Sequence, residues 1–132
     1  MSELILPDES YRIMGACFEV HKQMGCGFLE PVYQECLAIE LGLQSIPFIA
    51  QPFVELAYKN HLLIQRYQPD FVCFGQIVVE IKAVSSLNDE FRAQVLNYLH
   101  AVRKPLAILI NFGHHPKVEY ERIALTTTAR PN

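Results

Sequence analysis

The chain has 132 residues, of which 51% are hydrophobic and 19% are charged, and its formal net charge is −3. This length suits one domain, and this composition excludes disordered and fibrous proteins. No apolar run approaches the roughly 18 to 20 residues that span a bilayer, and no signal peptide is evident, so we expect a cytoplasmic protein that does not enter a membrane.

Neither an internal repeat nor a Gly/Ser linker interrupts the chain, so residues 1–132 are predicted to form a single domain, with 126–132 as a loose tail. The four cysteines form no C-x-x-C pair and are interpreted as reduced thiols.

Two helices are predicted first. Apolar residues recur at helical spacing from Asp8 to Met24, and the segment Gly25-Cys26-Gly27 ends that helix. Pro31 suits the first turn of a second helix, which runs to Leu41 with Glu30 at its cap.

Four extended segments follow, which we expect to join one sheet. Phe53–Tyr58 and Leu62–Tyr67 flank a turn-prone segment, and so do Asp70–Phe74 and Ile77–Ala83, so each pair predicts a hairpin. The last of the four is the most β-branched stretch of the chain.

A third helix is predicted from a cap at Asn88 or Asp89 to Arg103, followed by a buried strand at Leu106–Asn111 and an edge strand at Val118–Leu125. The order of elements indicates an α+β (mixed α/β) fold, in which helices flank a central mixed sheet of about five to six strands.

Charged residues interrupt the apolar strand Ile77–Ala83. Because side chains alternate along a strand, Glu80 and Lys82 face the same side, about 7 Å apart. Partly buried charges are costly unless they are paired or bind a ligand. Asp70 opens the neighbouring strand, and its carboxylate with that of Glu80 would offer hard oxygen ligands for Mg²⁺ or Mn²⁺.

This site depends on strand register. A two-residue turn at Gly75-Gln76 would set Asp70 opposite Ile81 and point it away from Glu80. A three-residue loop or a bulge would bring Asp70 to the face of Glu80 and Lys82, so we predict one of those near Phe74–Gln76.

Two further polar side chains are candidates. Glu30 and Tyr33 share a helical face, where the phenol would orient the carboxylate of a third acid. Gln94 lies in the inward stripe of the third helix, one turn from Phe91 and Tyr98, so we expect its amide to point toward the sheet rather than to water.

These residues carry a resemblance to a known family. Gly27-Phe28-Leu29-Glu30-Pro31-Val32-Tyr33 matches G-x-x-E-x-x-Y, and Pro69-Asp70 with Glu80-Ile81-Lys82 matches PD-(D/E)xK. The chain therefore resembles the bacterial GxxExxY proteins of the PD-(D/E)xK nuclease superfamily along nearly its whole length. The resemblance implies a restriction-endonuclease-like core, in which a mixed sheet carries the acids.

The resemblance, together with this geometry, assigns a role to each candidate. Asp70 and Glu80 would hold Mg²⁺ or Mn²⁺, and Glu30 would bind a second metal or orient water. Lys82 would place or activate a water, and Gln94 would hold water or phosphate. Arg66 and Tyr98 are the candidate substrate-binding residues. The expected activity is metal-dependent hydrolysis of phosphodiester bonds in DNA or RNA.

Other interpretations stay open for the same residues. Glu80 and Lys82 would also suit a salt bridge, Asp70 a turn, and Tyr98 and Gln94 packing positions. Fourteen acidic residues against 11 basic ones do not favour tight binding of nucleic acid. The alternative function is a catalytically silent nuclease fold that acts through a protein partner or as a homodimer.

Overall fold

A computed structural model of the protein describes residues 5–125, and the predicted tail at 126–132 lies outside them. The chain begins with two helices, α1 (Pro7–Met24) and α2 (Glu30–Leu43). Pro7 stands in the first turn of α1, where its missing N–H costs nothing, and Gly25 ends the helix at a φ of 71°. Both predicted helices are confirmed, although Glu30 is the first residue of α2 and not its cap, which is Leu29.

The central sheet has five strands in the order β1-β4-β5-β6-β7. They are β1 (Phe48–Ala50), β4 (Phe71–Cys73), β5 (Ile77–Lys82), β6 (Leu106–Asn111) and β7 (Glu119–Ala124). Among the strands of residues 5–125, only β5 and β6 pair in parallel, and α3 (Asp89–Val102) connects them. The mixed α+β fold is therefore confirmed, and β7 is the edge strand that the sequence predicts.

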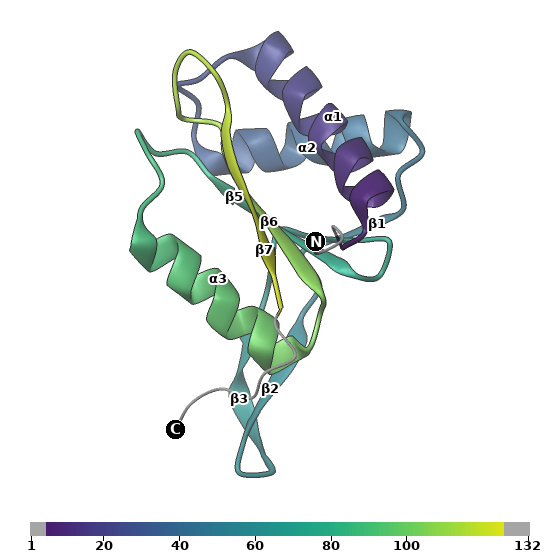
Figure 1. Cartoon of the computed structure of the whole chain (residues 1–132), viewed down its shortest axis with the longest axis vertical. Coiled ribbons are helices and arrows are strands. Elements are labelled where there is room, and N and C mark those ends of the chain that lie inside the picture. Colours follow the sequence, from purple (N-terminus) through teal and green to yellow (C-terminus); the bar gives the residue numbers. More distant parts are fainter. Residues whose placement is uncertain (1–4, 126–132) are drawn as a thin grey trace, which may run out of the picture.

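Helices cover both faces of the sheet, as Figure 1 shows, with α1 and α2 on one side and α3 on the other. Ile77, Val79 and Ile81 of β5 turn toward α1 and α2, whereas Val78 turns toward α3. All six residues of β6 are buried, because this interior strand is covered on both faces. Within residues 5–125, no helix has the length and apolar character needed to cross a membrane.

The second sheet differs from the prediction. β2 (Val54–Tyr58) and β3 (His61–Tyr67) do form the predicted hairpin, but they make a separate two-stranded sheet. The short strand β1, which the sequence analysis missed, pairs with β4 and takes the edge position. A hairpin pattern specifies which two strands pair with each other, not which sheet they join.

Asn111, at the end of β6, organises the connection from β5 to α3. Its buried side chain accepts hydrogen bonds from the N–H groups of Val84 and Gly113, both at 3.0 Å, and donates one to Glu119 at 3.1 Å. The connection ends at Asn88, whose side chain caps α3 by accepting the N–H of Phe91 at 3.0 Å. This cap confirms one of the two predicted positions.

Candidate active site

The connection between β4 and β5 decides where Asp70 lies. Cys73 pairs with Ile77, so three residues, Phe74 to Gln76, link the two strands. This register sets Asp70, just before β4, opposite Glu80 of β5. The predicted three-residue loop is confirmed, and with it the location of Asp70 on the α3 side of the sheet.

Two hydrogen bonds join Asp70 to β5. The backbone N–H of Asp70 donates to Oε1 of Glu80 at 3.2 Å, and the N–H of Ile81 donates to Oδ2 of Asp70 at 2.8 Å. Each carboxylate is thus held by a backbone donor and keeps a second oxygen for another partner.

Burial raises the pKa values of both acids. Desolvation, and then the charge of Asp70, raise the pKa of Glu80 to about 7. The hydrogen bond from the Asp70 backbone and the charge of Lys82 lower this pKa, but by less. The pKa of Asp70 is also raised, first by burial, while its hydrogen bond from Ile81 lowers it. Two partly buried acids that resist ionisation side by side are suited to a cation, whose charge would compensate both.

Lys82 lies on the same side of β5 as Glu80, as the strand alternation predicts. Its charge lowers the pKa values of both Asp70 and Glu80, although burial outweighs it at each. The ammonium Nζ lies 4.8 Å from the centre of the Phe91 ring on α3. Within the part of the chain that the structure describes, Lys82 forms no salt bridge with Glu80, so the simple ion-pair interpretation is not supported.

Glu30 lies on a different element from the other two acids, at the start of α2. It is exposed, and its charge contributes to the raised pKa of Asp70. Across residues 5–125, no three His, Cys, Asp or Glu side chains lie together as a metal-binding group. The structure therefore brings together two of the three predicted metal ligands.

Tyr33 does not orient Glu30 as predicted. Its hydroxyl donates to the carbonyl of Gly25 at 2.6 Å and accepts the N–H of Phe28 at 3.3 Å. The buried phenol thereby fixes the loop that precedes α2 instead of the carboxylate.

Gln94 is exposed, so the prediction that its amide turns away from water is wrong. The buried residues of α3 are Val95 and Leu99, and Gln94 lies at the border of that stripe. Helical spacing predicts which residues share a face of α3, but not how wide a part of that face the sheet covers.

The two candidate substrate-binding residues have aromatic partners. Arg66 is exposed, and its guanidinium lies 4.1 Å from the centre of the Phe53 ring. Tyr98 stacks on Tyr67, with ring centres 3.9 Å apart and planes at 4°. The charges of Glu80 and Asp70 act on Tyr67, so this residue lies near the two acids, which the sequence analysis did not predict.

Two further basic residues, Arg92 and Lys104, are engaged in contacts within the protein. Arg92 pairs with Glu121 and with Asp89, and Lys104 donates to the carbonyl of Gly75 at 2.9 Å. Neither contact lies at the two acids.

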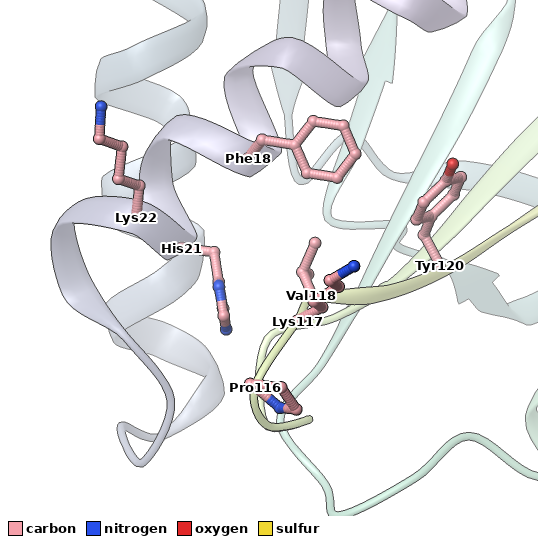
Figure 2. A pocket seen from close by; sticks show the side chains of 7 residues that line it. All are labelled: Phe18, His21, Lys22, Pro116, Lys117, Val118 and Tyr120. Carbon is pink, nitrogen blue, oxygen red and sulfur yellow. The ribbon is translucent and has the colours of Figure 1, made fainter.

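A cavity of about 340 Å³ lies between α1 and the connection from β6 to β7 (Figure 2). Its lining is apolar and basic and contains none of the predicted site residues: Phe18, His21, Lys22, Pro116, Lys117, Val118 and Tyr120. Tyr120 pairs with Ile110, which faces α1 and α2, so this cavity lies across the sheet from Asp70 and Glu80.

A family model for the PD-(D/E)XK nuclease superfamily matches residues 7–123. The chain belongs to the PD-(D/E)XK nuclease superfamily. The match covers α1 through most of β7 and includes both motif acids and Lys82. Comparisons with curated proteins and with solved structures gave no match. PD-(D/E)XK nucleases generally use divalent metal ions. The narrower resemblance to GxxExxY proteins stays a prediction.

Proposed function

We propose that this PD-(D/E)XK protein is a metal-dependent nuclease or related phosphodiesterase, which hydrolyses phosphodiester bonds of DNA or RNA with Mg²⁺ or Mn²⁺. The observation that carries the proposal is the placement of Asp70 opposite Glu80, with Lys82 on the same face. We place this activity in the cytoplasm, where the four free thiols would stay reduced.

The donor set fits a hard divalent cation. Mg²⁺ is usually held by one or two carboxylates and completes its shell with water and substrate phosphate. Asp70 and Glu80 would supply those carboxylates, and Glu30, whose charge already acts on Asp70, would be the third acid. A cation bound there would polarise the scissile phosphate and lower the pKa of a bound water.

The remaining residues would act directly on the substrate. Lys82 would place the attacking water and stabilise the negative charge that develops on the phosphate. Gln94, exposed on α3, would hold a water or a phosphate oxygen. Arg66 would bind a backbone phosphate, and Tyr98 would contact the substrate beside it.

Calorimetric titration of Mn²⁺ and Mg²⁺ tests the metal site. Wild type is compared with Asp70→Asn and Glu80→Gln, and Glu35→Gln serves as control because it removes an exposed acid of α2. The first two variants should bind at least about tenfold more weakly, because each loses a ligand charge. The control should bind as the wild type does.

Cleavage of single-stranded DNA, double-stranded DNA and RNA then tests the chemistry. Lys82→Met should retain metal binding but cleave about a hundredfold more slowly, because it removes charge stabilisation in the transition state. A folded wild type that binds neither cation would exclude this function.

The β2–β3 hairpin favours a second candidate function, that of a homodimeric binding module. The hairpin extends from the body of the protein (Figure 1), and Ile64 and Leu62 are 95% and 67% exposed. Tyr67, at the base of the hairpin, packs on Tyr98 of α3, whereas Ile64 and Leu62 lie beyond this contact and are exposed. Antiparallel pairing of β3 with β3 of a second copy, centred on Ile64, would cover these side chains and set no like charges opposite each other.

Sedimentation equilibrium of wild type and Ile64→Lys tests this alternative. A dimer that dissociates in the variant supports it, and a wild type that is monomeric at micromolar concentration excludes it. The result is independent of metal binding.

A further inference from the structure

Tyr67, the last residue of β3, is a buried polar side chain to which the proposed function gives no role. The residue is 5% exposed, and within residues 5–125 no polar group lies in hydrogen-bonding geometry with its buried hydroxyl, although Glu80 is nearby. Buried hydroxyls in native proteins almost always have a partner, so this one requires an explanation.

The ring of Tyr67 is firmly held. It stacks on Tyr98 of α3 at a centre-to-centre distance of 3.9 Å, and its backbone pairs with Val54 of β2. It also belongs to the apolar cluster on the α3 side of the sheet, which includes Val72 and Val78. Because the ring is clamped in this way, the direction of its hydroxyl is set before any ligand arrives.

That hydroxyl lies beside the two acids. Burial raises the pKa of Tyr67, and the nearby charges of Glu80 and Asp70 raise it further, so Tyr67 lies within electrostatic range of both acids. Glu80 has two carboxylate oxygens, and the Asp70 N–H occupies Oε1. A bound cation would favour the ionised form of the Glu80 carboxylate. An ionised carboxylate is a strong hydrogen-bond acceptor, and the neighbouring phenol of Tyr67 can donate to it.

We propose that Tyr67 is a positioning residue, whose hydroxyl donates a hydrogen bond to the Glu80 carboxylate when Glu80 holds a divalent cation, and thereby fixes which oxygen faces that cation. The inference rests on the proposed metal site and adds to it a residue outside both sequence motifs. Partners that orient a ligand in this way typically contribute about 10- to 100-fold to metal affinity.

Tyr67→Phe is the decisive variant, because it keeps the ring that stacks on Tyr98 and removes only the hydroxyl. The matched control is Tyr58→Phe, which removes a hydroxyl from the same hairpin at a residue that is 62% exposed. Both are titrated with Mn²⁺ by calorimetry, and the metal-free proteins are unfolded thermally.

Loss of the Tyr67 hydroxyl should lower the affinity for Mn²⁺ without lowering the melting temperature of the metal-free protein. Tyr67→Phe should bind Mn²⁺ at least about tenfold more weakly than wild type, while its metal-free form melts at the same temperature or higher, since an unpaired buried hydroxyl has been removed. A side chain with a purely structural role would lower the melting temperature and leave the affinity unchanged. The control should match the wild type in both measurements.

A spectroscopic measurement follows the hydroxyl directly. With ¹³C-labelled tyrosine, the Cζ resonance of Tyr67 should shift when Mg²⁺ is added to wild type and stay in place in Glu80→Gln.

The outcomes separate this inference from the proposed function. A wild type that binds no Mn²⁺ overturns both. A wild type that binds Mn²⁺, with Tyr67→Phe binding equally well, overturns only the role of Tyr67. A Tyr67→Phe protein that fails to fold also overturns it, because the hydroxyl would then be a structural contact.

Discussion

The carboxylates of Asp70 and Glu80 are each held by a backbone N–H of the opposite segment. The N–H of Asp70 donates to Oε1 of Glu80, and the N–H of Ile81, next to Glu80, donates to Oδ2 of Asp70. This reciprocal arrangement keeps two partly buried acids within range of each other's charge. The acids are therefore pre-organised for a cation, and the metal-free protein must tolerate their mutual repulsion. The pH dependence of stability and of metal binding follows from this relationship.

The metal-free protein should lose stability as the pH rises through about 7. The folded state raises the pKa of Glu80 from its ordinary value of 4.5 to about 7, so it holds the proton more tightly than the unfolded chain does. The resulting stabilisation is complete below pH 4.5 and is lost above pH 7, and it amounts to about 3 kcal/mol. Urea unfolding of wild type and Glu80→Gln at pH 5 and pH 8 measures it, and equal changes in the two proteins would contradict it.

Metal affinity should increase over the same pH range. Mn²⁺ competes with the proton on Glu80, whose pKa is about 7, so binding at lower pH must first displace that proton. Calorimetry in buffers of different ionisation enthalpy should therefore detect proton release at pH 6 and little at pH 8. An affinity that is constant across this range would show that Glu80 is not a ligand.

Gly113→Ala should destabilise the protein by about 1–3 kcal/mol. A Cβ atom at Gly113 would lie 2.5 Å from the carbonyl oxygen of Val84, a backbone atom that cannot move without disturbing the Asn111 hydrogen bonds. The control is Gly15→Ala, in the middle of α1, where a Cβ meets nothing within 4 Å and should stabilise the helix by about 0.5–1 kcal/mol. Thermal unfolding compares the two, and a neutral Gly113→Ala would mean that this connection is not closely packed.

Tyr33→Phe should cost about 1–3 kcal/mol of stability, because it leaves the Gly25 carbonyl and the Phe28 N–H without their partner. The variant retains the ring that stacks on Phe112 at 4.7 Å, so the change isolates the hydroxyl. Tyr11→Phe, at a residue that is 80% exposed, should change stability by less than about 0.5 kcal/mol. Denaturant unfolding measures both, and similar small effects would indicate that water replaces the lost hydroxyl.

Local patterns in the sequence were sufficient for features that lie within one element. The alternation of β5 placed Glu80 and Lys82 on one face, Gly25 marked the end of α1, and Pro31 marked the start of α2. These features depend on the geometry of a single strand or helix, which repeats every 2 or 3.6 residues whatever surrounds it.

Contacts between elements required the tertiary structure. The two possible loops at Phe74–Gln76 placed Asp70 on opposite faces, and only the folded register selected the three-residue loop. The exposure of Gln94 and the separate β2–β3 sheet also depended on packing between distant segments.

The sequence by itself therefore determined the superfamily motifs, the fold class and the residues available for metal chemistry. Only the tertiary structure decided that Asp70 faces Glu80 and that Tyr67 brings an unpartnered hydroxyl near them. It also decided that, within residues 5–125, Glu30 does not join the two acids in a metal-binding group. The physical reason is that periodicity is a property of one element, whereas a site is assembled from several elements, and loop conformation and packing set their relative positions.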